Sequence, residues 1–378
     1  MHRHTLVFAV PVVFAAALAA CSSDSNTTPP TTTTDAGQDA KSDLPDPLVD
    51  LPSNWRERAA GYLDAQAAAW LDSPPAISNV KCAMSCHTTF PYVLAHTALT
   101  GAMTPAVGDT RNRIEARLVE IAAGTAKPYY GKAGSAKEKE SHATEAVLNA
   151  TALAMDDVNT GATLGAKTKQ SLDRMWELQR ADGTWDWLEY GLFPWETRND
   201  WAVAMAAMTA GSIPSNTTAK QAAAVAKMKA YVKDRMVDGE DPVTLHDRVA
   251  LLWAKSAMND LITDEQAAAI ADEVSSKQLA DGGFSLGSWG SGKLAATTAG
   301  KSDGYATAFA TLALCKSGKD GAKRDDVRRG LTWLATHQEE SGAWLGASVN
   351  SKNELNKEYM SDAATAYAAM AITVCGGK

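Results

Sequence analysis

Three stretches of the chain repeat one pattern of glutamine, glycine and an aromatic residue. WELQRADGTWDWL begins at Trp176, SSKQLADGGFSLGSW at Ser275 and LATHQEESGAWLGAS at Leu334. In each, the glutamine lies four residues before the glycine and six before the aromatic residue, at Gln179, Gly183 and Trp185, at Gln278, Gly282 and Phe284, and at Gln338, Gly342 and Trp344. Each follows a helical apolar pattern. Internal similarity at a regular spacing indicates a repeat architecture, so one helical unit is expected to recur along the chain.

A second pattern, offset from the first, consists of an aspartate followed by an alanine-rich helix. DWAVAMAAMTAG, DRVALLWAKSAM, DGYATAFATLAL and DAATAYAAMAIT begin at Asp200, Asp247, Asp303 and Asp362. A carboxylate at a helix start accepts hydrogen bonds from the first N–H groups, so these aspartates are expected to be N-caps. Alanine allows helices to approach closely, which suits the inner ring of a repeat protein.

Helical periodicity and chain-breaking residues predict twelve helices, and no alternating β-rich run competes with them. The expected ranges are 53–71, 88–101, 107–124, 141–158, 163–180, 197–211, 216–237, 243–258, 263–279, 302–317, 323–338 and 359–375. Six pairs of an outer and an inner helix predict an all-α fold, an (α/α)6 toroid, over residues 52–378.

The N-terminus carries the features of an export signal. MHRH is followed by the apolar run TLVFAVPVVFAAALAA, which is short for a transmembrane helix. LAAC, ending at Cys21, resembles the bacterial lipobox, which implies cleavage of residues 1–20 and a lipid on the Cys21 sulfur; the alternative is a plain signal peptide. Residues 21–51 are rich in Ser, Thr, Pro and Asp and are expected to form a disordered linker. We therefore expect a bacterial envelope protein anchored by lipid, in the outer rather than the inner membrane, with its domain in the periplasm or at the cell surface.

The sequence KCAMSCH, residues 81–87, differs from the haem-attachment motif C-x-x-C-H by one extra residue between the cysteines. Haem c attachment needs two thiols, here Cys82 and Cys86, and an adjacent iron ligand, here His87. A Cys82–Cys86 disulfide, two free thiols or an incomplete zinc site are the alternatives. A second axial ligand is not fixed by spacing, and the nearby candidates are His96, Met103 and His142.

The glutamine–glycine–aromatic turns resemble the QW repeats of the squalene cyclase and protein prenyltransferase superfamily. PWETRNDWAVAMAA (194–207) and SDGYATAFATLAL (302–314) are similar to bacterial members, some of which carry a haem-attachment-like motif followed by a phrase like HTTFPYVLAHTAL (87–99). The resemblance implies an α/α toroid in which the glutamine and tryptophan tie each outer helix to the next connection. The acidic strings D-x-D-D and D-C-T-A-E of the cyclases and the Asp-x-Cys of the zinc prenyltransferases are absent from the sequence. The resemblance therefore implies the fold without the cyclase chemistry.

The centre of a toroid is a natural ligand site, and acidic and aromatic residues are expected at its rim. The candidate rim acids are Glu196, Asp200, Asp303 and Asp362, and the nearby rings are Trp195, Trp201, Tyr305 and Tyr367. The alternative assigns the acids to helix caps and the rings to the core. Cys315 and Cys375 lie near the ends of neighbouring inner helices, where they form either a disulfide or buried thiols.

These observations predict an exported, redox-associated lipoprotein whose toroid binds covalent haem c. The redox partner is not identified, and no catalytic residue is assigned. One alternative is a toroid with a Cys82–Cys86 disulfide that binds a hydrophobic small molecule, either as a polyprenyl- or lipid-binding protein or as a terpenoid cyclase-like one. A third hypothesis is a carbohydrate-active toroid. The formal net charge is −8 and no basic stripe occurs, so nucleic acid is not an expected partner.

Overall fold

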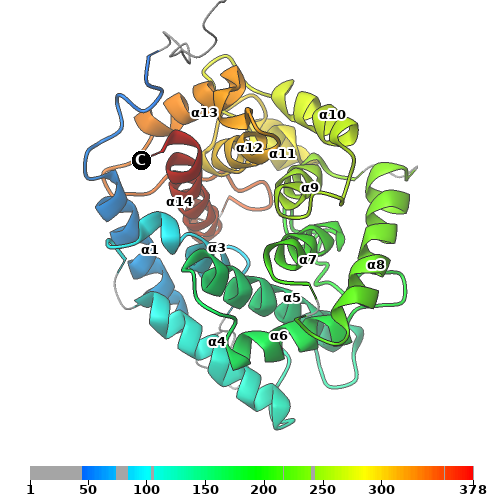
Figure 1. Cartoon of the computed structure of the whole chain (residues 1–378). Helices are drawn as coiled ribbons and strands as arrows, with labels where there is room; N and C mark the ends of the chain where they lie inside the picture. The colour runs from blue at the N-terminus through cyan, green and yellow to red at the C-terminus, as the bar shows by residue number, and fades with distance from the viewer. Residues whose placement is uncertain are drawn as a thin grey trace, which may run out of the picture. The chain divides into compact units, whose positions relative to one another are not determined.

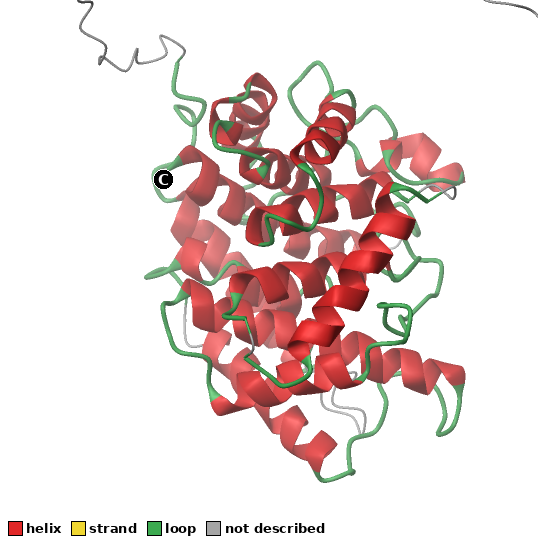
Figure 2. Cartoon of the chain, turned by 45° about the vertical axis from the view of Figure 1, so that its right-hand side comes forward, coloured by secondary structure: helices red, strands yellow, loops and turns green. Residues whose placement is uncertain are grey.

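The computed structural model describes residues 45–73, 84–103, 106–215, 217–239, 243–352 and 354–377. The predicted signal peptide, the lipid-anchor residue Cys21 and the predicted haem ligand Cys82 lie outside the described residues. Within the described ranges the fold is all-helical, with two isolated β-bridges and no named strand (Figures 1 and 2). None of the described helices is both long and apolar enough to cross a membrane.

The helices of residues 45–378 form two concentric rings (Figure 1). The inner helices are α3 (Thr89–Leu94), α5 (Ala136–Asn159), α7 (Asp200–Ser212), α9 (Leu245–Ala257), α12 (Gly304–Lys316) and α14 (Glu354–Gly376). The outer helices are α1 (Trp55–Leu71), α4 (Ala106–Ala122), α6 (Ala166–Glu177), α8 (Gln221–Tyr231), α10 (Asp264–Ser275) and α13 (Asp325–Thr336). Each inner helix contacts the next, and α14 returns to α3, so the ring closes. The predicted (α/α)6 toroid is confirmed.

Every predicted helix has a counterpart, but four regions differ in detail. The second predicted helix breaks after Leu94 and continues as the short 3₁₀ turn η1 (Thr97–Leu99). Helix α8 continues as the π-helical turn η2 (Val232–Val237). The connection to α12 contains the short helix α11 (Lys293–Thr298) and a 3₁₀ turn, η3 (Leu286–Ser288), which the sequence did not predict, and η4 (Gly321–Lys323) precedes α13.

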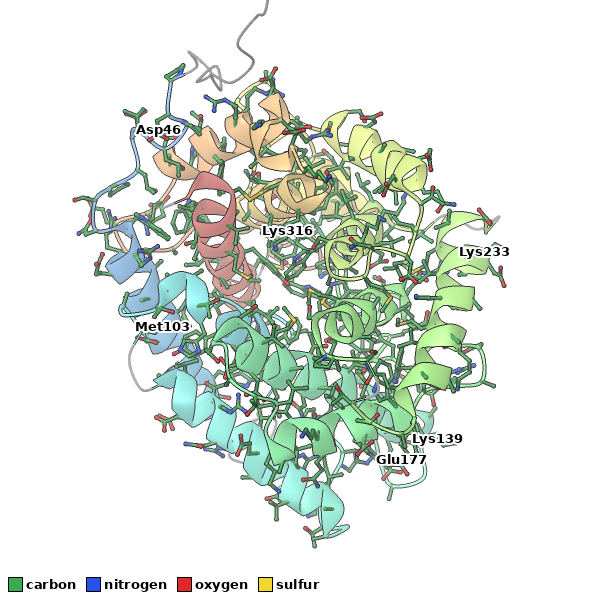
Figure 3. The ribbon with its side chains drawn as sticks, in the orientation of Figure 1. Asp46, Met103, Lys139, Glu177, Lys233 and Lys316 are labelled. Atoms are coloured by element: carbon green, nitrogen blue, oxygen red, sulfur yellow. A yellow bond between two sulfur atoms is a disulfide. The ribbon has the colours of Figure 1, made fainter. Side chains whose placement is uncertain are left out.

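Burial separates the two rings as the alanine-rich pattern predicted. Every residue of α12 from Gly304 to Cys315 is buried, because this helix is covered by its inner neighbours and by α13. Helix α13 buries one face through Val327, Leu331 and Leu334, as expected of an outer helix. Side chains crowd the space between the rings (Figure 3).

The repeated glutamine turns join successive outer helices. Gln179 Nε2 donates to the carbonyl of Gly183 (3.1 Å) and to that of Ala224 in α8 (2.9 Å). Gln278 makes the corresponding bonds to Gly282 and to Asp326 in α13. Gln338 bonds Gly342 and the carbonyl of Trp55, the first residue of α1, at 2.9 Å. The third turn therefore closes the outer ring between the two ends of the repeat array.

The prediction that each aspartate caps an inner helix is right for Asp303 and wrong for the others. Asp303 is the N-cap of α12, and its side chain accepts from the Ala306 N–H at 3.0 Å. In α7 the N-cap position is held by Asn199, whose side chain makes no capping bond, and Asp200 is the first helical residue. Asp247 follows the Thr244 cap of α9, and Asp362 lies well inside α14 because that helix begins at Glu354.

Cys315 and Cys375 form a disulfide that joins the ends of α12 and α14. The Cα atoms are 6.0 Å apart and the two residues are separated by 60 positions in the sequence. Of the two alternatives that the sequence left open for these cysteines, the structure therefore shows the disulfide. The bond ties the last two inner helices, which pack along each other.

Candidate functional site

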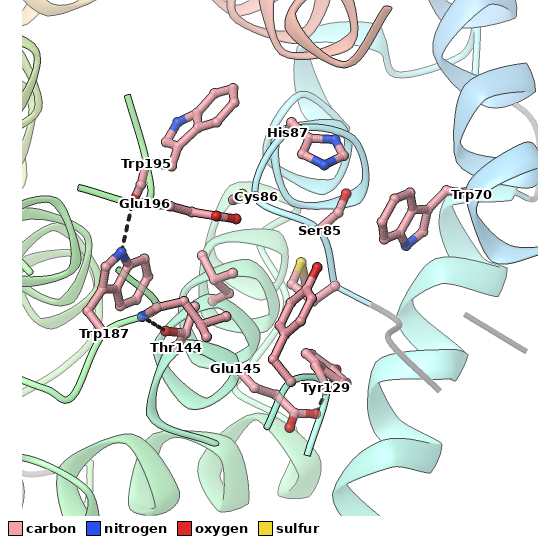
Figure 4. Close-up of a pocket in the computed structure, with 14 residues that line it drawn as sticks. Trp70, Ser85, Cys86, His87, Tyr129, Thr144, Glu145, Trp187, Trp195 and Glu196 are labelled. Atoms are coloured by element: carbon pink, nitrogen blue, oxygen red, sulfur yellow. Dashed lines mark hydrogen bonds between the residues drawn. The ribbon is translucent and has the colours of Figure 1, made fainter. Parts of the chain in front are cut away.

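An aromatic cavity opens at the residues that the sequence singled out. It consists of an outer space of about 430 Å³ and an inner recess of about 50 Å³. Figure 4 draws the residues that line the recess. Both spaces are lined by Cys86, His87, Tyr130, Trp195 and Glu196. The outer volume lies within the range of small-molecule and cofactor sites. The part of the predicted haem motif that the structure describes is therefore on a cavity wall.

The loop from Trp187 to Glu196 presents two of the wall residues. The Glu196 N–H donates to the Leu192 carbonyl at 2.9 Å, and the Glu196 carbonyl accepts from the Gly191 N–H at 2.8 Å, which closes a tight turn. Trp187 Nε1 donates to the Trp195 carbonyl at 2.7 Å (Figure 4). These bonds fix the backbone, so Trp195 and Glu196 are held at the cavity.

Glu196 is the acidic group of the outer cavity. Burial raises the pKa of its carboxyl from 4.5 to about 7, and nearby Lys137 offsets part of that rise. A carboxyl in this range is protonated in a large fraction of molecules near neutral pH. Glu145, which lines the inner recess, instead pairs with Arg117 at 2.7 Å and accepts from Tyr129.

The turn before α3 positions Cys86 and His87. The Ser85 hydroxyl accepts from the backbone N–H groups of Thr88 and Thr89 at 3.0 and 3.1 Å, and the Thr89 hydroxyl accepts from the Ser85 N–H at 2.8 Å. Side-chain oxygens thus satisfy the first donors of the helix. Cys86 and His87 lie inside this braced turn and are half-buried.

His87 is enclosed by aromatic rings. Tyr359 stacks on it with ring centroids 4.0 Å apart, and Trp70 meets it edge-on at 5.3 Å. Burial lowers the pKa of His87 to about 3, so the imidazole is neutral, as a metal ligand must be. Its Nδ1 lies 2.9 Å from the Thr88 hydroxyl, which donates to Asp362 Oδ2 at 2.7 Å.

Of the four predicted rim acids, only Glu196 is among the residues that line the cavity. Asp362 lies behind His87, where it accepts from Thr88 and Tyr62. Asp200 is buried in a separate group, paired with Arg198 at 2.9 Å and accepting from Tyr231. Asp303 caps its helix and also accepts from the Leu286 N–H. Of the predicted rim acids, Glu196 therefore lines the cavity and Asp362 supports His87, whereas Asp200 and Asp303 have structural roles.

The three candidates for a second axial ligand do not line the cavity. His96 pairs with Asp156 at 2.7 Å, and His142 lies 3.9 Å from Glu138. Met103 packs against the hydrophobic core. Two other methionines, Met84 and Met360, line the inner recess and the outer cavity respectively.

Several residues of the site were not assigned to it from the sequence, among them Tyr62, Trp70, Thr88 and Tyr359. Thr88 follows His87 directly in the quoted phrase HTTFPY, so proximity was the available signal. Trp70 and Tyr359 come from α1 and α14, which meet only when the ring closes. No local pattern relates those two positions to residue 87.

The wall residues fit a haem attached through cysteine and held by histidine. Such a haem requires a neutral imidazole, an adjacent thiol and largely apolar walls. His87 is neutral, Cys86 is its neighbour, and the rings of Trp195 and Tyr359 line the same space. The second predicted thiol, Cys82, is outside the described residues.

Comparison with known proteins finds likeness in three-dimensional structure. No protein-family model matches the sequence, and a search of curated proteins finds no match. A solved protein from Actinoplanes matches with a TM-score of 0.49 and 11% identity, over 85% of this chain and 98% of its own. Unsaturated glucuronyl hydrolase from Streptococcus agalactiae matches with a TM-score of 0.49 and 11% identity, over 87% of this chain and 94% of its own. A type II terpene cyclase from Scytonema, solved with geranylgeranyl dihydroxybenzoate, matches with a TM-score of 0.47 and 11% identity, over 84% of this chain and 99% of its own.

Proposed function

We propose that this protein carries one covalent haem c at the cavity wall and takes part in electron transfer in the bacterial envelope. The observation that supports the proposal is the placement of Cys86 and a neutral His87 together on an aromatic cavity. His87 would hold the iron, and Cys82 and Cys86 would form the thioether bonds. When bound, the haem supplies reversible one-electron transfer.

The chain's own residues perform the supporting tasks. The Ser85 turn fixes the backbone of the attachment residues, and Tyr359 and Trp70 restrict rotation of the His87 ring. The largely apolar aromatic walls would favour the reduced, less charged state of a haem iron held there. The mouth of the cavity is lined by the exposed side chains of Tyr130, Tyr190 and Leu192, so the site stays open to a partner.

The test is a pyridine haemochrome assay on the full chain, produced with its own export signal in a host that has a cytochrome c maturation system. We expect about one haem per chain, retained after acidic acetone extraction and located on the peptide of residues 81–87 by mass spectrometry. C82S and C86S together should abolish retention, whereas H142A, a histidine away from the cavity, should leave it unchanged. A colourless protein with a Cys82–Cys86 disulfide would refute the proposal.

The proposed location rests on the sequence at the N-terminus. We propose that Cys21 carries the lipid that anchors the domain to the membrane, the outer one in preference to the inner. Metabolic labelling with a radioactive fatty acid should mark the wild type and not C21A, and C21A should move from the membrane to the soluble fraction. Labelling of C21A to the wild-type level would contradict the anchor.

A second candidate function is supported by Glu196. A carboxyl group with a pKa raised to about 7 among Trp195, Tyr130 and Tyr190 suits binding of an apolar or ring-shaped molecule, such as a polyprenyl lipid, a terpenoid or a sugar. In this case the cysteines of residues 82–86 only staple a loop. Lipid extraction and native mass spectrometry of the purified protein distinguish the two, because this candidate predicts a bound organic ligand, without haem, that C82S retains and E196Q weakens.

A further inference from the structure

We infer that Thr88 and Asp362 are positioning residues that hold His87 as the Nδ1–H tautomer and leave the lone pair on Nε2. The purpose of this arrangement rests on the proposed function, because an iron ligand needs a free nitrogen lone pair. The tautomer itself is a property of this chain that exists without haem.

His87 Nδ1, the Thr88 hydroxyl and Asp362 Oδ2 form a chain of hydrogen bonds in which each proton can be assigned. The Thr88 hydroxyl has a single proton, and it donates that proton to Asp362 Oδ2 over 2.7 Å. The same oxygen lies 2.9 Å from His87 Nδ1. Since its proton is already used, the hydroxyl can only accept there, so Nδ1 carries the hydrogen. A neutral imidazole has one N–H, and Nε2 is therefore the nitrogen with the lone pair.

Asp362, at the far end of this chain of hydrogen bonds, is held in place as well. Tyr62 of α1 donates its phenol proton to Asp362 Oδ1 at 2.8 Å, so both carboxylate oxygens accept hydrogen bonds. Asp362 is 2% exposed, which keeps water from competing for these bonds. The chain of hydrogen bonds joins α1, the turn before α3 and α14, three segments brought together by closure of the ring.

Ring packing prevents His87 from turning to exchange its two nitrogens. Tyr359 stacks on its face at 4.0 Å and an interplanar angle of 21°, while the Trp70 edge lies 5.3 Å away. Among the described residues, no hydrogen bond involves His87 Nε2. Nε2 is therefore the nitrogen of His87 left available to the cavity that His87 lines.

The test is nitrogen NMR of the full chain, labelled with ¹⁵N-histidine and produced without a haem maturation system. At about pH 8.5, above the raised pKa of Asp362, about 7, the carboxyl is ionised and can only accept. We expect a protonated-type shift for Nδ1 and an unprotonated-type shift for Nε2 of His87, assigned with H87Q. T88S, which keeps the hydroxyl, should retain this pattern, and T88V should lose it.

D362N is the most specific variant. Tyr62 donates to the amide oxygen, so the amide NH₂ faces Thr88 and donates to it; the Thr88 proton then turns to Nδ1, and the hydrogen of His87 moves to Nε2. Y62F leaves the Thr88–Asp362 bond in place and should keep the wild-type tautomer. A wild type with Nε2–H, or a D362N variant with the wild-type pattern, would overturn the inference.

These measurements separate the inference from the haem proposal. A protein that takes up no haem but shows the expected tautomers refutes the proposed function and retains the inference. In the haem-loaded protein, loss of the Nδ1 hydrogen bond makes the imidazole a poorer donor, so T88V should raise the midpoint potential and T88S should not. Equal potentials in T88V and wild type would count against a role of Thr88 in tuning the iron.

Discussion

Replacing Glu196 with glutamine should make the protein more stable at alkaline pH and leave its stability at acidic pH nearly unchanged. The neutral amide has the shape of the protonated carboxyl but cannot ionise. Burial disfavours the ionised form of Glu196, so the native state binds its proton more tightly than the unfolded chain does.

The sign and size follow from the two pKa values. In the unfolded chain the carboxyl titrates near 4.5, and in the folded protein near 7. The stability that the protonated group contributes is fully present below about pH 4.5 and is lost as the pH rises to about 7. The whole difference corresponds to about 3 kcal/mol. Because Glu196 is partly exposed and only part of the change falls between pH 5 and 8, we expect about 1.5 kcal/mol over that interval.

The assay is urea unfolding of wild type and E196Q at pH 5 and pH 8, followed by tryptophan fluorescence. The stability advantage of E196Q should grow by about 1.5 kcal/mol from pH 5 to pH 8. E340Q, at an exposed glutamate, is the matched control and should show no such growth. If E196Q tracks the wild type at both pH values, the burial of a neutral carboxyl at this wall is refuted.

Two further predictions concern how the ring is held together. C315S should lower the free energy of unfolding by up to about 4 kcal/mol, since the Cys315–Cys375 disulfide closes a loop of 60 residues; unfolding in urea measures this, and an unchanged midpoint would contradict it. G342A should cost more than about 2 kcal/mol, because the glycine has φ of +93° and an added Cβ would lie 2.1 Å from the Arg58 carbonyl oxygen. G134A has a similar φ with nothing within 4 Å and isolates the backbone cost, so equal losses in the two variants would show that the close approach is relieved.

The sequence by itself determined the architecture. The recurrence of Gln179, Gln278 and Gln338 with their glycines predicted repeated units, and alanine-rich runs marked the inner helices. These signals are local because a repeat protein builds its core from contacts between neighbouring units. The structure adds that the glutamine side chains bond the next outer helix, and that Gln338 reaches back to Trp55.

For the site, the sequence identified the residues that are adjacent along the chain. Cys86 and His87 were found as a motif, and Glu196 was found as one acid among four. The roles of the other aspartates depend on where each helix begins. Asp303 lies just before its helix and serves as a cap, whereas Asp362 lies inside α14, where its two carboxylate oxygens accept from Thr88 and Tyr62. An aspartate before an alanine-rich run has the same local pattern in both cases.

Only the tertiary structure decided what surrounds His87. Tyr62 and Trp70 come from α1, Tyr359 and Asp362 from α14, and Glu196 from a loop on another repeat. Ring closure brings the first and last helices together and encloses the imidazole, and burial there raises the pKa of Asp362 although the hydrogen bonds from Thr88 and Tyr62 lower it. The chemistry of the cavity depends on burial and on proton sharing across these segments, which are properties of the closed ring and of no single stretch of sequence.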